Sequence, residues 1–185
     1  MFPAGLLVAL LLAQAEGAAG REQMRLCLEK DGDDGLAACR KALATGLTAL
    51  HAGITQDALS RKLIALLRFQ EAEAALGELV RLRTKDPEAW LRLGELRLHS
   101  LGRAEDAIPP LEESIRLKGD SAEARASLGL ALAALGRLGP AADAFREALG
   151  IDPRFFETRP ASRQIFEAAE RGEAWPAAAS GDPKH

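Results

Sequence analysis

The 185-residue sequence predicts an all-α protein, an α-solenoid of antiparallel helix pairs, and three observations support this. Apolar residues recur every three or four positions from residue 22 to 171, which is the spacing of one helix face, and no stretch alternates with period two. Between residues 53 and 155, a pattern of small and apolar residues repeats about every 34 positions. Alanine and leucine dominate, whereas aromatic residues make up 4% and tyrosine does not occur, a composition that favours closely packed helices.

Residues 1–15 have the features of a secretory signal peptide. An uncharged apolar run over 6–13 is too short to span a membrane, and it ends in Ala13-Gln14-Ala15, an A-x-A cleavage motif. No cysteine follows directly, so we expect no lipid anchor. We therefore expect an exported protein, periplasmic or secreted, and the preference for Ala and for Arg over Lys favours a bacterial one. The alternative is an uncleaved apolar N-terminal segment.

Residues 16–52 predict an N-terminal helical hairpin, with helices at about 22–28 and 34–43 and a turn at Asp31-Gly32-Asp33. Cys27 and Cys39 flank this turn almost symmetrically, so an antiparallel hairpin brings them side by side. In an exported protein this pair predicts a disulfide. It would close a short loop and contribute about 3 kcal/mol. Two buried free thiols are the alternative.

Three repeats follow, at 53–86, 87–121 and 122–155, and each predicts a pair of helices. Small residues stand in register within both helices of each pair. Glycine inside a helix costs about 1 kcal/mol relative to alanine, so this register indicates that the two helix axes approach closely. Larger residues should fill the space toward the adjacent hairpin. The first helices carry Ser60, Gly94 and Gly129, the second helices carry Ala72, Ala107 and Ala141, and the large residues are Leu76, Leu111 and Phe145.

Local signals predict where helices begin. Thr55 is the expected N-cap of the first helix of the first repeat, and Asp86-Pro87 is expected to open the second repeat. Pro109-Pro110 is tolerable only in the first turn of a helix, which makes Asp106 the expected cap there. Residues 156–171 predict a capping helix opened by a proline, and 172–185 predict a disordered tail rich in Gly, Pro, Ala and Ser.

Over residues 53–155 the pattern resembles the tetratricopeptide repeat (TPR) family. The third repeat matches best, the second has Trp90 in the signature tryptophan slot, and the first lacks both signature glycines. The second repeat departs by one inserted residue before Gly102. The matching residues of the third repeat are Leu128-Gly129, Gly136, Ala141, Phe145, Ala148-Leu149 and Asp152-Pro153, and the family's tyrosine slot holds Leu63, Arg97 and Leu132.

The resemblance implies that the first helices line a concave groove that binds an extended or helical peptide. The leucines in the lining slots would take apolar side chains of a partner, and the arginines an acidic one. The lysines and asparagines with which some family members clamp a C-terminal carboxylate are absent from these slots. The alternative is that several of the lining residues pack beneath the terminal helix. The candidate groove residues are Arg61, Ile64, Leu91, Arg92, Glu95, Leu98, His99 and Leu130.

We therefore expect a monomeric, non-enzymatic adaptor or assembly factor of the cell envelope that binds another protein or peptide. The run Gly35-Leu-Ala-Ala with the two cysteines also resembles disulfide-bridged α/α-hairpin repeat proteins, and an enzyme or redox module is the alternative of a different class. The formal net charge is −3 with interspersed signs, which argues against nucleic-acid binding. Nucleophile motifs, phosphate-binding loops and metal-ligand spacings are absent from the sequence, so no cofactor or metal is expected. After the short apolar run at residues 6–13, no other apolar run reaches membrane-spanning length either.

Overall fold

The computed structural model describes residues 4–173, with side chains from residue 17 onward, and every regular element in this part is a helix. The predicted all-α class is therefore confirmed. The chain divides into two compact units, Met1–Thr84 and Lys85–His185, here called the first and the second unit. Most of the predicted disordered tail, residues 174–185, lies outside the described residues.

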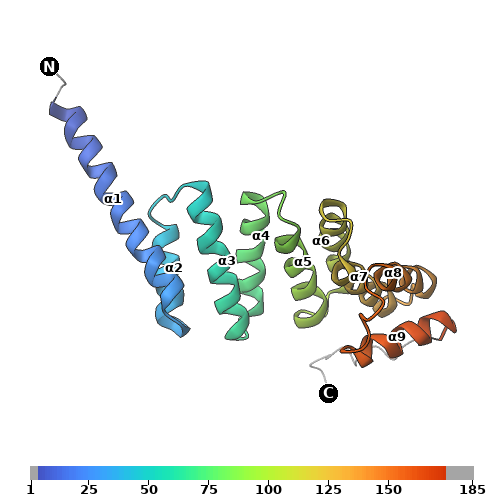
Figure 1. Ribbon diagram of the computed structural model, residues 1–185. Coiled ribbons are helices and arrows are strands. Elements are labelled where there is room, and N and C mark those ends of the chain that lie inside the picture. The colour runs from blue at the N-terminus through green and yellow to red at the C-terminus, as the bar shows by residue number, and fades with distance from the viewer. Residues whose placement is uncertain (1–3, 174–185) are drawn as a thin grey trace. The chain divides into compact units, whose positions relative to one another are not determined.

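The first unit consists of two antiparallel hairpins whose helices pack in chain order (Figure 1). The helices are α1 (Ala4–Glu29), α2 (Gly32–Leu43), α3 (Ala49–Ala65) and α4 (Phe69–Leu82). Helix α1 is much longer than the helix expected at residues 22–28. Its helical backbone begins at Ala4 and continues through the predicted cleavage motif. The side chains of residues 1–16 lie outside the described ones, and the signal peptide stays a prediction.

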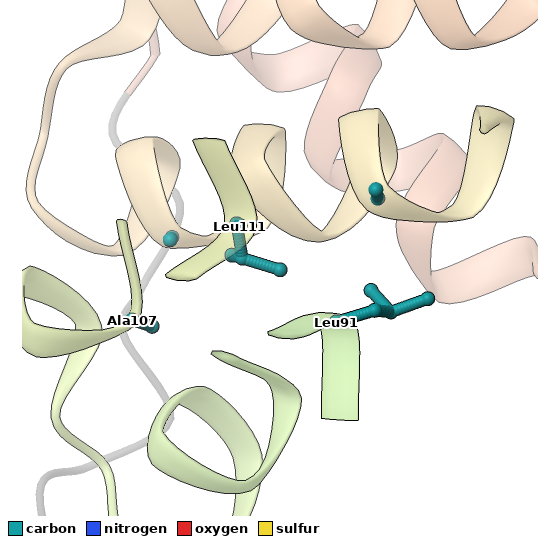
Figure 2. Packing of buried hydrophobic residues seen from close by; sticks show 5 residues of the cluster. Leu91, Ala107 and Leu111 are labelled. Carbon is teal, nitrogen blue, oxygen red and sulfur yellow. The ribbon is translucent and has the colours of Figure 1, made fainter. Parts of the chain in front are cut away.

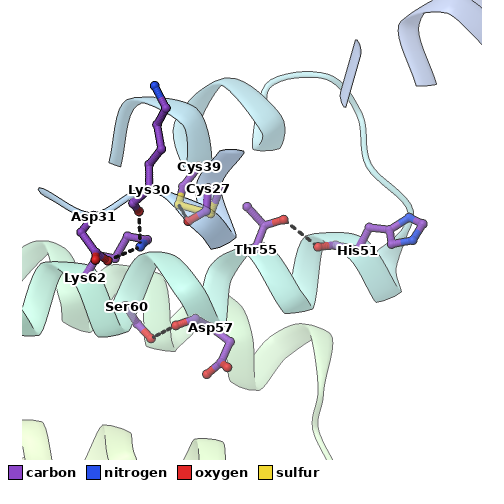
Figure 3. The surroundings of a disulfide bond; sticks show 9 residues. All are labelled: Cys27, Lys30, Asp31, Cys39, His51, Thr55, Asp57, Ser60 and Lys62. Atoms are coloured by element: carbon purple, nitrogen blue, oxygen red, sulfur yellow. Dashed lines mark hydrogen bonds and ion pairs between the residues drawn. A yellow bond between two sulfur atoms is a disulfide. The ribbon is translucent and has the colours of Figure 1, made fainter. Parts of the chain in front are cut away.

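The predicted disulfide joins α1 to α2. The Sγ atoms of Cys27 and Cys39 are 2.10 Å apart, and both residues are fully buried (Figure 3). Gly35, in the first turn of α2, permits the hairpin to close, since a Cβ there would lie 2.2 Å from the backbone oxygen of Lys30. The first hairpin is thus held by a covalent bond and by a backbone contact that excludes any side chain.

The second helices show that the N-terminal hairpin is a further copy of the repeat. The fourth residue of α2 is Gly35, and Cys39 follows it by four positions, fully buried. The same two positions of α4 hold Ala72 and Leu76, which are also fully buried. In α6 and α8 these positions hold Ala107 with Leu111 and Ala141 with Phe145. The disulfide therefore lies where the other hairpins place a large apolar side chain.

The second unit has two further hairpins and a terminal helix. Its elements are α5 (Pro87–Glu95), a π-helical segment η1 (Leu96–Ser100), α6 (Ala104–Leu117), α7 (Ala122–Ala134), α8 (Leu138–Ile151) and α9 (Pro160–Glu170). The expected capping helix opened by proline is α9, which packs on α7 and α8. Its Phe166 joins Phe145 and Phe156 in an aromatic cluster with ring centroids 5.6–5.9 Å apart.

The close approach predicted from the small residues is present in both hairpins of the second unit. A Cβ on Gly94 would lie 2.6 Å from Cγ of Leu111, and one on Gly129 would lie 3.1 Å from the ring of Phe145. Leu111 also belongs to a buried cluster with Leu91 and with alanines of α6 and α7 (Figure 2). The large residues therefore fill space within their own hairpin as well as toward the next one.

Two of the predicted helix starts are wrong and one is confirmed. Helix α3 begins six residues before Thr55, and its N-cap is Thr48, whose hydroxyl accepts from the backbone N–H of His51. Thr55 is buried inside the helix, and its Oγ1 donates to the backbone oxygen of His51 at 2.8 Å (Figure 3). Helix α5 begins at Pro87, as the sequence predicted, and the Asp86 carboxylate accepts from the first free N–H groups of this helix.

The other wrong prediction is the cap at Asp106. Helix α6 begins at Ala104, so Pro109 and Pro110 lie in its second turn. Pro110 has no N–H to donate to the backbone oxygen of Asp106, and Nη1 of Arg97 donates to that oxygen instead, at 3.0 Å. Arg97 lies in η1, which accommodates the residue inserted before Gly102. The arginine in the tyrosine slot therefore compensates for a proline in the facing helix.

The degenerate first repeat leaves one strained residue. Gly102 and Gly136 end the first helices of their hairpins at positive φ, which glycine adopts freely. The corresponding residue of the first repeat is Leu67, with φ of 58° and a side chain exposed to solvent. A left-handed backbone costs an L-residue about 1–2 kcal/mol.

Candidate functional site

The predicted groove residue Arg61 lies in a pocket on the inner face of α3 in the first unit. The opposite wall comes from the end of α1 and the turn that follows it, through Leu28 and Asp31. Ile64 is half-buried and does not line this pocket. The lining residues are Leu28, Asp31, Ile54, Asp57, Ala58, Arg61, Lys62 and Ala65. Sequence reasoning missed Leu28 and Asp31, because they belong to the hairpin that it did not recognise as a repeat.

Charged side chains of opposite sign stand beside exposed apolar ones in this pocket. Nη2 of Arg61 bonds Oδ2 of Asp57 at 2.7 Å, and the arginine side chain remains 69% exposed. Leu28 is 50% exposed. The pocket can therefore contact an apolar side chain and an acidic group of the same ligand.

Lys62 connects the two walls of the pocket. Its side chain is only 12% exposed, and Nζ donates to the backbone oxygen of Lys30 and to Oδ1 of Asp31 at 3.1 Å (Figure 3). These acceptors lie directly after α1, three and four residues from Cys27. Lys62 thus fixes the disulfide hairpin to α3 beside the pocket, and this contact keeps the shape of the pocket defined.

In the second unit two of the predicted groove leucines pack against apolar clusters. Leu91 is 3% exposed and belongs to the core with Leu111, so it does not present its side chain to a ligand. Leu130 is half-buried and packs in the cluster of Phe155 and Phe156. The neighbouring slots on α5 and α7 alternate between core and surface, and the sequence pattern did not separate them. Both leucines therefore contribute to packing within the unit.

Glu95 is the polar centre of the second unit's inner face. It is half-buried, and its Oε1 accepts a hydrogen bond from Oγ of Ser127 at 3.1 Å. Burial raises the pKa of Glu95, and the carboxylates of Glu123 and Glu88 raise it further, against the hydrogen bond from Ser127. The positive charge of Arg159 has the smallest effect, and it lowers the pKa of Glu95. Nη2 of Arg159 lies 3.5 Å from Oε1 of Glu123.

The remaining predicted residues flank Glu95. Arg92 is half-buried, and Leu98 packs at the edge of the Leu91 cluster. His99 lies in η1 and is exposed to solvent, and desolvation by the surrounding atoms lowers its pKa. In the described part of the chain, no group of three His, Cys, Asp or Glu side chains is arranged to hold a metal ion. None of the helices that the structure describes has the length and apolar character needed to span a membrane.

Helical hairpins packed one after another within each unit define a helical-repeat protein. The family model for the tetratricopeptide repeat matches residues 58–122 and 100–154, which together cover more than half of the chain. The protein belongs to the tetratricopeptide repeat family, whose fold is consistent with protein–protein interaction.

Solved structures of other repeat proteins share this fold. MamA protein superposes with a TM-score of 0.73 at 24% identity, over 84% of this chain and 83% of MamA. YrrB, a TPR protein described as having an unusual peptide-binding site, gives 0.57 at 20% identity over 82% and 78%. The thermophilic TPR protein TTC0263 from Thermus thermophilus gives 0.56 at 20% identity over 84% and 81%. At these identities the likeness concerns the fold alone. Among curated proteins, no sequence matches this chain.

Proposed function

We propose that this protein is an exported TPR scaffold that binds a peptide segment of another protein. The binding surface is the pocket on the inner face of α3, and the second unit offers further partly exposed residues around Glu95. In this proposal the protein is a monomeric adaptor or assembly factor of the cell envelope and catalyses no reaction.

The observation that carries the proposal is the composition of the α3 pocket. Its walls offer exposed apolar surface on Leu28 next to the accessible guanidinium of Arg61. A peptide with an apolar side chain followed by an acidic one matches this arrangement. Leu28 is exposed, and the guanidinium of Arg61, which bonds Asp57 through Nη2, has further N–H groups to offer a second carboxylate. Lys62 and the disulfide keep the opposite wall in place, which lowers the entropy cost of binding.

Export is supported by two independent features. The apolar run and the A-x-A motif of residues 1–15 suit a signal peptidase substrate, and a buried disulfide suits an oxidising compartment. Cell fractionation and N-terminal sequencing test this part, and the expected first residue of the mature chain is Glu16. Recovery of the protein in the cytoplasm with an intact N-terminus would contradict it.

The scaffold role is supported against a redox function by the position of the cysteines. Both are fully buried, and thiol–disulfide exchange requires a thiolate to reach a sulfur atom. The disulfide lies in one hairpin, where it occupies a packing position of the repeat. A structural role in holding the pocket wall therefore explains it better than electron transfer.

Binding is tested by retention of a partner from an envelope extract, followed by its identification and titration against the purified chain. Leu28→Asp with Arg61→Glu should abolish retention, because the first change removes the apolar wall and the second reverses the charge. Arg116→Glu is the matched control, since the Arg116 side chain is 66% exposed on α6 and does not line the pocket. Far-UV circular dichroism should be the same for all variants. Equal retention by the double variant and the control would refute the proposed surface.

A further inference from the structure

A second hollow lies in the first unit, and it shares no lining residue with the inner-face pocket. It has a volume of about 280 Å³ and lies among α2, α3 and α4. Its floor is apolar and includes Leu59, Leu63 and Ala75, whereas Arg40, Gln56 and Glu78 contribute polar groups. The function proposed above does not use this hollow.

The third repeat shows how the chain fills the equivalent position. Each residue there follows its counterpart in the first repeat by 69 positions, as Gly129 follows Ser60. In the same register Arg125 corresponds to Gln56, and Glu147 corresponds to Glu78. The side chain of Arg125 is only 16% exposed, and its Nε donates to Oε2 of Glu147 at 2.9 Å. The third repeat thus closes its slot with an arginine that extends from α7 to a carboxylate on α8.

The first repeat keeps the acceptor of this arrangement, Glu78, and has Gln56 in place of the arginine. Among the residues that the structure describes, Glu78 forms an ion pair only along its own helix, with Arg81. Both side chains are largely exposed, so the pair contributes little to stability. The amide oxygen of Gln56 is buried, and no hydrogen-bond donor reaches it in the described part of the chain. A buried acceptor without a donor costs free energy. Arg40 is engaged by Glu71 at 2.6 Å, which leaves Glu78 as the acidic group facing the hollow without a cation from another helix.

We propose that this hollow binds an arginine side chain of a partner protein. The methylene stem lies over Leu59 and Leu63, as the stem of Arg125 lies buried in the third repeat. The guanidinium donates to the carboxylate of Glu78, and rotation of the Gln56 amide brings its oxygen to a further N–H. Arginine is favoured over lysine because its planar, multiple-donor head serves two acceptors at once.

The test is a titration of the full chain with capped Ala-Ala-Arg-Ala-Ala and with matched peptides that carry lysine or citrulline in place of arginine. Backbone amide NMR shifts of the protein monitor the binding. Citrulline has nearly the shape of arginine without its charge. The arginine peptide should give saturable shifts at Leu59, Ala75 and Glu78, the lysine peptide a weaker response at the same residues, and the citrulline peptide none. Saturation by citrulline to the same extent, or no saturable shift with arginine, would overturn the proposal.

Two variants assign the binding to the hollow. Glu78→Gln should weaken the binding of the arginine peptide about fivefold. Glu112→Gln changes an exposed carboxylate of α6 and should leave the affinity for the peptide unchanged. Gln56→Arg supplies the arginine from within the chain, so it should abolish binding and raise the melting temperature. Glu78→Gln decides the test alone if Gln56→Arg does not fold. Unchanged affinity in Glu78→Gln would overturn the assignment. Trp90 follows Gln56 by 34 positions, as Gly94 follows Ser60, so the second repeat has a tryptophan at this position. Preferential binding of a tryptophan peptide would therefore also overturn the assignment.

Discussion

Adding a methyl group at Gly94 tests the close approach of the helix axes. The new Cβ would lie 2.6 Å from Cγ of Leu111 and 3.3 Å from the backbone oxygen of Ala107. Leu111 is fully buried, so it cannot move into solvent. Overpacking of this kind costs about 1–3 kcal/mol, whereas alanine gains about 1 kcal/mol over glycine in a helix. The balance of these two effects predicts that Gly94→Ala lowers the free energy of unfolding by up to about 2 kcal/mol.

Two other helical glycines complete a graded series. A Cβ at Gly129 would lie 3.1 Å from the ring of Phe145, a contact that a small ring shift relieves, so Gly129→Ala should be nearly neutral. No atom lies within 4 Å of a Cβ placed on Gly77 in α4, so Gly77→Ala should stabilise the protein by about 0.5–1 kcal/mol. The gain in helix propensity is common to both variants, so the free energies of unfolding of the Gly77 and Gly94 variants should differ by the cost of overpacking, about 1–3 kcal/mol.

The assay is urea unfolding monitored by far-UV circular dichroism, with the m-value compared between variants. A double-mutant cycle then isolates the contact. Leu111→Ala alone should cost about 2–5 kcal/mol, and it should cost less in the Gly94→Ala background because the new methyl group occupies part of the vacated space. A Gly94→Ala protein as stable as Gly77→Ala, or strictly additive effects in the cycle, would refute the reasoning.

Three further predictions concern single positions. Leu67→Gly should raise the free energy of unfolding by about 1 kcal/mol, because it relieves a positive φ at an exposed residue; a loss of stability in urea unfolding would contradict this. Arg97→Met should lower the free energy of unfolding by about 1 kcal/mol, because the backbone oxygen of Asp106 loses its donor. The loss should be smaller in a Pro110→Ala background, where residue 110 has a backbone N–H. Equal losses in both backgrounds would contradict this explanation. Burial raises the pKa of Glu95, so the folded state binds a proton on this carboxyl more tightly than the unfolded state does. The free energy of unfolding therefore falls as the pH rises from 4.5, the ordinary pKa of glutamate, through the pKa of Glu95 in the folded state. Glu95→Gln should therefore stabilise the protein at neutral pH and have little effect below pH 4.5, as unfolding at several pH values will show.

The sequence predicted the hairpin interiors well because those positions have strict requirements. A small residue opposite a large one, repeated in register, has few explanations other than close helix packing, and both Gly94 and Gly129 confirm it. The pair Cys27 and Cys39 was predicted for a similar reason, since the turn between them fixes their distance.

Longer-range features escaped the sequence pattern. The copy in the N-terminal hairpin was missed because Gly35 and Ala72 are 37 positions apart, whereas the later small residues are 35 and 34 apart. The prolines of α6 were misplaced because Arg97, from another helix, satisfies the oxygen that Pro110 leaves free. Leu91 was assigned to the groove because core and inner-face positions adjoin on the same helix, and only the packing of the neighbouring hairpin separates them.

Hydrogen–deuterium exchange of the chain with and without its purified partner is the most direct test of the α3 pocket as the binding surface. The proposal predicts slower exchange over residues 28–31 and 54–65 on binding, with the Leu28→Asp and Arg61→Glu double variant showing no such change. Protection confined to the outer helices α4 and α8, or protection of 54–65 that persists in the double variant, would contradict it.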